Sequence, residues 1–71
     1  MNRNEPAYLD PARGDVIKRD GKFYRVTGRG VADSVGFVRT TAGGAGMQGQ
    51  KSLPCWRRLI EAGEIVSHGA R

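Results

Sequence analysis

The chain has 71 residues, of which 12 are Lys or Arg and 7 are Asp or Glu, and its formal net charge is +5. With 38% hydrophobic residues and 11 glycines, we expect one small domain with a thin core and many turns. The single cysteine excludes an internal disulfide and cannot complete a zinc site with the single histidine, and no apolar run is long enough to span a bilayer. We therefore expect a cytoplasmic protein without metal, cofactor or membrane partner, and the charge favours an anionic partner.

Residues 1–13 contain two prolines around Tyr8 and Leu9 and show no sustained periodicity. We expect an extended N-terminal arm that docks in part through Tyr8 and Leu9 and is frayed over its first five residues. A single small β-barrel-like domain is predicted for residues 14–66, and residues 67–71 are expected to form a flexible tail.

A β-hairpin is predicted in residues 14–26, where two β-patterned runs flank Asp20 and Gly21. Asp-Gly is typical of a type I′ turn, whose two central residues need positive φ. Pairing outward from this turn places Lys18 opposite Phe23 and gives the hairpin two different faces. One face carries residues that can join a core, namely Ile17, Tyr24 and Val26. The other carries an aromatic residue among cations, in the set Val16, Lys18, Phe23 and Arg25.

The next 15 residues are predicted to form a turn-rich connection at 27–33 and a third strand at 34–41, which is rich in β-branched and aromatic residues. Alternation along this strand places Val35, Phe37 and Arg39 on one face and Val38 and Thr40 on the other. A glycine at position 36 suggests a bulge or a bend.

Residues 42–51 form a glycine-rich segment that lacks both strand and helix patterning, so we expect a mobile linker. Its glycine spacing is superficially that of a phosphate-binding loop. However, Gln50 stands before Lys51 and Ser52 where the Walker motif needs glycine. The segment therefore favours a linker over a nucleotide site.

One helix is predicted in residues 52–66. Pro54 fits its first position after a cap at Ser52 or Leu53, and Gly63 fits the position just past its end. An apolar stripe is made by Trp56, Leu59 and Ile60, whereas Arg57, Arg58 and Glu61 are expected to face away. A short closing strand is predicted at residues 64–66.

Together these elements predict a mainly β domain with one helix, an α+β fold. Its Gly14-Asp15-Val16-Ile17 run, the Asp20-Gly21-Lys22 turn, Tyr24-Arg25-Val26 and Val35-Gly36-Phe37-Val38 resemble the opening of SH3-like and KOW-type barrels. The pattern is also similar to that of the amino-terminal domain of the translation elongation factor P family. The resemblance covers residues 14–41 and implies a small, partly open antiparallel barrel or meander capped by a C-terminal helix. Barrels of this kind often bind RNA, ribosomal surfaces or other proteins. The family's modified-lysine loop has no counterpart, because no lysine lies between Gly28 and Ser34.

The leading functional hypothesis is a binding module for nucleic acid, RNA or DNA, with little sequence specificity, because no recognition helix is apparent. Phe23 would stack on a base, and the surrounding cations would contact phosphates. The candidate residues are Lys18, Lys22, Phe23, Arg25, Arg29 and Arg39. Alternatively, Phe23 belongs to the core and the cations lie at its rim, or Arg29 is only a solubilising loop charge.

A second hypothesis is a protein-interaction or inhibitory module of the kind encoded by phages and other mobile elements, docking on an acidic protein surface. Its candidate interface is Tyr8, Trp56, Arg57 and Arg58, although Trp56 is also the best candidate for the centre of the core. Dispersed acids and a cysteine without an assisting base indicate no catalytic constellation, so we do not expect an enzyme.

Overall fold

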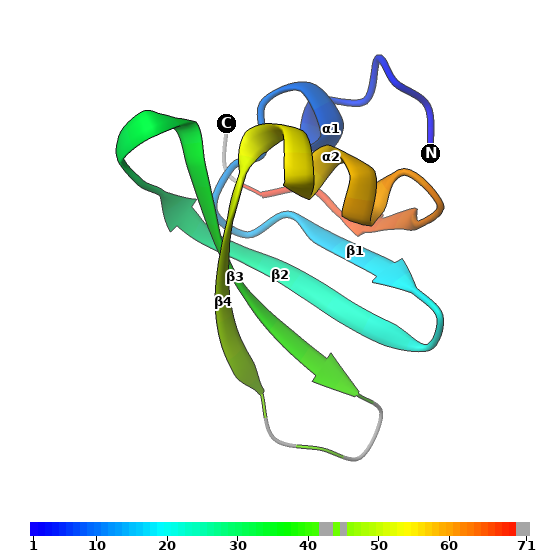
Figure 1. Cartoon of the computed structure of the whole chain (residues 1–71). Coiled ribbons are helices and arrows are strands. Elements are labelled where there is room, and N and C mark those ends of the chain that lie inside the picture. Colours follow the sequence, from blue (N-terminus) through cyan, green and yellow to red (C-terminus); the bar gives the residue numbers. More distant parts are fainter. Residues whose placement is uncertain (42–43, 45, 70–71) are drawn as a thin grey trace.

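In the part of the chain that the structure describes, five antiparallel strands form one sheet in the order β4-β3-β2-β1-β5. The computed structural model describes residues 1–41, 44 and 46–69 of the chain. The elements in chain order are α1 (Pro6–Leu9), β1 (Val16–Arg19), β2 (Lys22–Arg29), a short 3-10 turn (Val31–Asp33), β3 (Ser34–Thr41), β4 (Met47–Ser52), α2 (Leu53–Ile60) and β5 (Glu64–Ser67). Figure 1 shows both helices at one end of the sheet, with the β3–β4 hairpin projecting away from them. The fold is therefore mainly β with a helix, and its curved sheet is not closed into a barrel.

The β1–β2 hairpin has the predicted turn and register. Asp20 and Gly21 both have positive φ, at 51° and 74°, as a type I′ turn requires. Lys18 pairs with Phe23, and the pairing continues without a shift from Arg19–Lys22 to Val16–Arg25. The register of β2 against β3 shifts between Val26 and Gly28, which lies opposite Gly36. The extra residue is Thr27, so the irregularity suggested at position 36 is a bulge in the strand opposite, β2, and not in β3 itself.

The core lies between one face of the sheet and α2. Its buried strand residues are Ile17, Tyr24, Val26, Val35 and Phe37, and α2 contributes Trp56 and Ile60. Trp56 is fully buried, and its ring lies 5.4 Å from that of Phe37. The predicted helical stripe and the predicted core face of the hairpin therefore pack against each other. Helix α2 begins after its N-cap Ser52, with Pro54 in its first turn as expected.

Helix α2 ends before the position just ahead of Gly63, where the sequence predicted its end. Ile60 is the last residue of α2, and Gly63 does not adopt the positive φ of a glycine cap. A Cβ at Gly63 would stand 2.8 Å from Ile17 Cγ2 and 2.9 Å from the carbonyl oxygen of Lys18. Glycine is needed here because the chain passes close to β1 before it enters β5.

The prediction of a linker at residues 42–51 is wrong for residues 47–51, which lie in β4. This strand pairs with β3 along its whole length, from Arg39–Met47 to Ser34–Ser52. The strand is held by backbone pairing with β3 and by the close packing of Gly49 on the Phe37 ring. Neither interaction produces a hydrophobic pattern in the sequence. Residues 42, 43 and 45 of the expected linker lie outside the described part of the chain.

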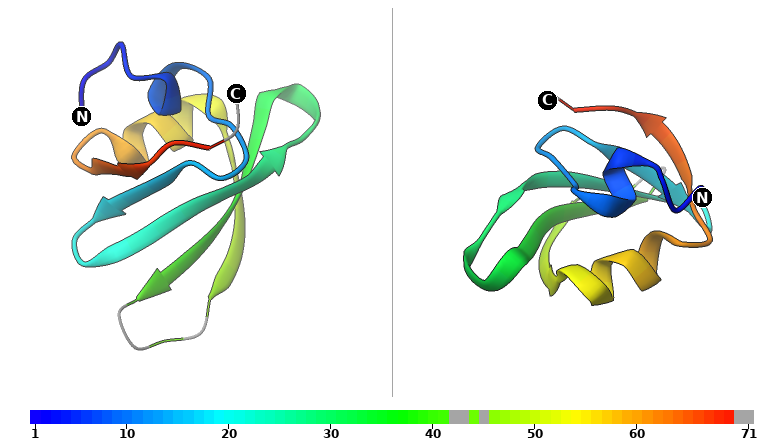
Figure 2. Two further views of the ribbon diagram at one scale, coloured as in Figure 1. Left: turned by 180° about the vertical axis from the view of Figure 1, so that it is seen from behind. Right: turned by 90° about the horizontal axis from the view of Figure 1, so that it is seen from above.

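The N-terminal arm docks through a single helical turn. Ala7 in α1 is fully buried, and its carbonyl oxygen accepts a hydrogen bond from Trp56 Nε1 at 3.3 Å. Figure 2 shows α1 beside α2 from two further directions. Leu9 is 48% exposed, so it contributes less to docking than the sequence suggested. The first residues also make contacts, because the amino group of Met1 donates a hydrogen bond to the carbonyl oxygen of Glu61.

Candidate nucleic-acid interface

Helix α2 packs against one face of the sheet and leaves the opposite face uncovered by any described element. We call this opposite surface of β1, β2, β3 and β4 the open face. The strand register brings two rows of side chains together on it. One row is Val16, Arg25, Val38 and Gln48, and the other is Lys18, Phe23 and Thr40. A shallow hollow in this surface is lined by Val16, Phe23, Arg25, Val38 and Thr40.

Phe23 lies in β2 between Lys18 of β1 and Thr40 of β3, close to the Asp20-Gly21 turn, and is neither buried nor fully exposed. The ammonium group of Lys18 stands 5.8 Å from the centre of its ring, which is cation–π range. Lys18 and Arg25 are both exposed. Neither makes an ion pair with another residue in the described ranges. The open face therefore presents an aromatic ring and two cations whose charges are available to an external anion.

Carboxylates border this surface at its β1 end, where Asp20 and Glu64 line a hollow together with Lys18. Glu64 of β5 pairs with Lys18 in the sheet register, so its side chain points to the same side. Its position lowers the positive potential at the β1 end of the open face.

Three of the six residues predicted for a nucleic-acid site do not lie on the open face. Alternation places Lys22 on the side of Tyr24, and Arg39 pairs with Tyr24 on that same side. Arg29 is held within the fold, with a 2.8 Å ion pair to Asp10 and hydrogen bonds to the carbonyl oxygens of Ser34 and Pro11. These contacts show a structural role for Arg29 that neither sequence interpretation included.

The residues suggested for a protein interface do not form one surface. Trp56 is fully buried and offers no contact area. Arg57 does not face away from the fold, because it donates hydrogen bonds to the carbonyl oxygens of Tyr8 and Leu9 at 3.0 and 2.7 Å. Its guanidinium group also stands 5.7 Å from the Tyr8 ring centre. Arg58 remains exposed, as expected.

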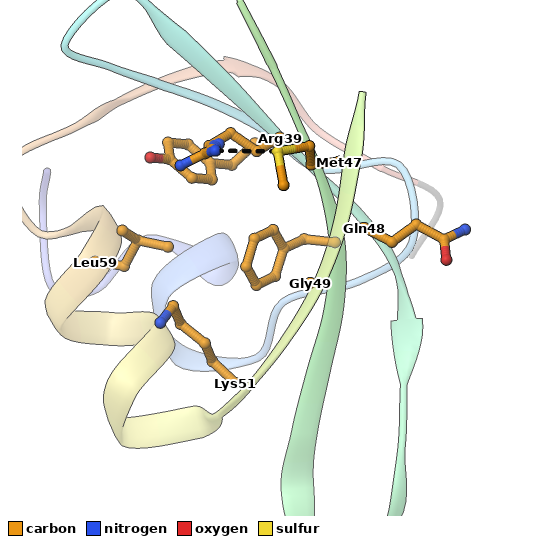
Figure 3. A pocket seen from close by; sticks show the side chains of 8 residues that line it. Arg39, Met47, Gln48, Gly49, Lys51 and Leu59 are labelled. Carbon is orange, nitrogen blue, oxygen red and sulfur yellow. Dashed lines mark hydrogen bonds between the residues drawn. The ribbon is translucent and has the colours of Figure 1, made fainter. Parts of the chain in front are cut away.

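A second hollow, which the sequence did not suggest, lies on the other side of the sheet between α2 and β4 (Figure 3). Its lining residues are Tyr24, Phe37, Arg39, Met47, Gln48, Gly49, Lys51 and Leu59. Figure 3 shows Arg39 and Lys51 at opposite ends, with Leu59 of α2 across from β4 and Gln48 pointing away. Only the position of Arg39 beside Phe37 follows from strand alternation, since β4 itself was not predicted.

Other reactive groups are dispersed. Cys55 is exposed on α2, and the described residues contain no group of three or more His, Cys, Asp or Glu side chains able to hold a metal ion. The carboxylate of Glu61 raises the pKa of Arg3 through a hydrogen bond and through its charge. No helix within the described ranges is long and apolar enough to cross a membrane. Comparisons with protein-family models, with curated protein sequences and with solved structures give no match to this chain.

Proposed function

We propose that this protein is a small binding module that associates with single-stranded nucleic acid through its open face. The observation that carries the proposal is the partly exposed Phe23 ring with Lys18 beside it, on a sheet face that no described element covers. Aromatic rings on a sheet accept bases by stacking whatever their sequence, and neighbouring cations neutralise the phosphates. The sequence of β1 to β3 resembles that of SH3-like modules, and a module of that kind would offer one face of its sheet to a ligand.

The contacts divide by role. Phe23 would stack on one base, with Val16 and Val38 giving apolar contact at either side. Lys18 and Arg25 would contact phosphates, and Arg25 can do so with two parallel hydrogen bonds. Thr40 and Gln48 add hydrogen-bonding groups at the border. Because phosphate contacts carry no sequence information, binding would be only weakly specific, and it would not involve catalysis.

The decisive experiment is a fluorescence anisotropy titration with labelled single-stranded oligonucleotides at several salt concentrations. With Lys18 and Arg25 as the phosphate contacts, the logarithm of the affinity should fall against the logarithm of salt with a slope of about −1.4. Phe23→Leu should weaken binding by roughly tenfold, because it removes a stacking surface worth about 1–3 kcal/mol per base. Phe23→Tyr keeps an aromatic ring and should bind like the natural chain.

Charge variants test the same surface in both directions. Lys18→Gln should reduce the salt slope by about 0.7, whereas Arg58→Gln on α2 removes an equal charge away from the open face and should leave the slope unchanged. Glu64→Gln should tighten binding two- to threefold, roughly, by removing a nearby negative charge. Equal effects of Lys18→Gln and Arg58→Gln, or no binding at low salt, would refute the proposal. Binding of an acidic protein to the same face, without oligonucleotide binding, would favour a protein-interaction module instead.

A further inference from the structure

The two edges of the sheet differ in how well they are protected. An edge strand leaves the N–H and C=O groups of every second residue unpaired, and proteins commonly blunt such edges by shortness, bulges, proline or charge. The β5 edge has four residues, and its register against β1 shifts between Val16 and Ile17. The β4 edge has six residues, contains no proline and pairs with β3 in an unbroken register. Within the described ranges, β4 has no partner strand on its outer side.

The hollow described above lies beside this edge. Met47, Gly49 and Lys51 share one side of β4 and line the hollow together with Arg39 and Leu59. Gly49 has no side chain because a Cβ there would stand 2.7 Å from the Phe37 ring, and that ring, which is 6% exposed, forms the floor beneath the middle of the strand. Met47 is 61% exposed. An added strand would therefore find an apolar surface at its centre.

The ends of the hollow are positive. Arg39 pairs with Met47 near one end, and Lys51 lies four residues further along β4. No carboxylate is among the lining residues that the structure describes. Among the described residues, the guanidinium group of Arg39 has a hydrogen bond only to the sulfur of Met47, at 3.4 Å, and Lys51 makes no ion pair. Both charges are thus available to an external ligand.

We infer that β4 and this hollow bind an extended acidic peptide segment, which adds to the sheet as a strand beside β4. Lys51 lies on β4, and Arg39 lies on β3 beside Met47, so the two charges are four residues apart along the strand direction, roughly 13 Å. They match two acidic side chains at positions i and i+4 of such a segment, the one near Arg39 reaching across Met47. The residue at i+2 points to the same side and would contact Phe37 and Leu59. The segment recognised is therefore acidic–x–apolar–x–acidic, a pattern that reads the same in either strand direction.

A second copy of the chain fits this edge less well than an acidic peptide. Antiparallel pairing of two β4 strands would bring Lys51 of both copies into one ribbon, with Arg39 of each copy on the neighbouring strand β3, and each copy carries a net charge of +5. Like charges that face each other across strands are destabilising. The charge distribution therefore selects an acidic partner. This inference concerns the side of the sheet opposite to the open face and does not depend on nucleic-acid binding.

The test uses the full chain and labelled synthetic peptides of the stated pattern, followed by anisotropy and by NMR shifts of the backbone amides. Binding should shift the amides of residues 47–52 and slow hydrogen exchange at alternate positions among them. The double variant Arg39→Gln and Lys51→Gln should weaken peptide binding roughly tenfold. The double variant Lys18→Gln and Arg25→Gln is the matched control, with two charges removed from the open face, and should retain most of the affinity.

Backbone pairing is tested on the peptide so that folding of the protein is not disturbed. Methylating every second backbone nitrogen should abolish binding in one register and leave it nearly unchanged in the other. A scrambled peptide of equal charge should bind at least fivefold, roughly, more weakly. Equal affinity for the scrambled peptide, shifts confined to the open face, or dimerisation through β4 without peptide binding would each overturn the inference. Oligonucleotide binding that persists in the Arg39→Gln and Lys51→Gln variant would show that the two sites are separate.

Discussion

At the scale of single residues, Asp15 connects segments that are distant in the sequence. It is fully buried, and its two carboxylate oxygens accept hydrogen bonds from the backbone N–H groups of Ala12 at 2.8 Å and Gly69 at 2.6 Å. The Asp15 carbonyl oxygen also accepts a bond from Val26 N–H at 2.9 Å. The side chain thus joins the end of the arm to the segment after β5, and the backbone of the same residue joins the start of β1 to β2.

Asp15→Ala should lower the free energy of unfolding by about 2 kcal/mol or more, because two N–H groups lose a charged acceptor. Asp15→Asn preserves the volume and keeps one acceptor oxygen, so this variant should lose less free energy of unfolding than Asp15→Ala. Urea denaturation measures both losses, and amide hydrogen exchange at Gly69 reports the released segment directly. A change below about 0.5 kcal/mol for Asp15→Ala would contradict this role.

The roles of individual cations could be predicted only in part. Lys18 and Arg25 were placed correctly, because the Asp-Gly turn fixes the register of the hairpin. The strand pattern also gave the side on which Arg39 lies, and the structure shows that this side is not that of Phe23. Partners of Arg29 and Arg57 include backbone carbonyl oxygens of the arm. Carbonyl oxygens are present at every residue, so sequence patterns do not reveal which of them meet a given arginine.

At the scale of elements, the β1–β2 hairpin shows how one turn sets two surfaces. Its register assigns Tyr24 to the core and Phe23 to the open face. A shift of one residue would exchange the two rings. The conformation of the Asp20-Gly21 turn therefore determines which side chains lie on the open face as well as which join the core.

Two glycine variants of β2 and its turn separate backbone strain from packing. Gly21 has a φ of +74° and Gly28 does not have positive φ, while a Cβ at either position meets no atom within 4 Å. Gly21→Ala should cost about 1 kcal/mol, because a Cβ disfavours the left-handed region. Gly28→Ala should be neutral or slightly stabilising, since it restricts the unfolded chain. Urea denaturation measures the free energy of unfolding of both variants. Equal losses for Gly21→Ala and Gly28→Ala would show that the positive φ of Gly21 does not make a Cβ unfavourable there.

Strand β4 was missed for a physical reason. Five of its six residues are exposed and Gly49 is only partly covered, so no apolar alternation marks the strand. Its position is set by pairing with β3, whose Val35 and Phe37 were correctly predicted to share one face, and by its direct connection to α2. Long-range pairing of this kind is absent from local propensity. The hollow beside α2 could not be predicted without it.

At the scale of the whole molecule, the arm and α2 stabilise each other. Trp56 donates a hydrogen bond to the carbonyl oxygen of Ala7, and Arg57 donates hydrogen bonds to those of Tyr8 and Leu9. Helix α2 covers the core, and the arm in turn covers one side of α2. The sequence indicated partial docking of the arm, but it left open which face of the hairpin α2 covers. Both faces carry large apolar side chains, Phe37 on one and Val38 with Phe23 on the other. Which of the two faces α2 covers is decided only by how their side chains pack against Trp56.

Deleting residues 1–9 should lower the midpoint of thermal unfolding by roughly 10 °C or more, because Trp56 loses its hydrogen-bond partner and its cover. The emission of Trp56 should move to longer wavelength in the same variant. Arg3→Gln breaks only the exposed ion pair between the arm and Glu61, and it should leave the midpoint unchanged. A truncated chain that unfolds like the full chain would show that the arm is dispensable.

Because α2 covers only one face of the sheet, the two sides of the molecule can be addressed separately by chemistry. The single cysteine of the sequence, Cys55, is exposed in the first turn of α2 and so lies on the side away from the open face. A maleimide linker at this thiol would attach every molecule to a sensor surface in one orientation, with Phe23 directed toward the solution. The natural sequence therefore already contains a handle for immobilised binding measurements, and no residue of the open face needs to be changed.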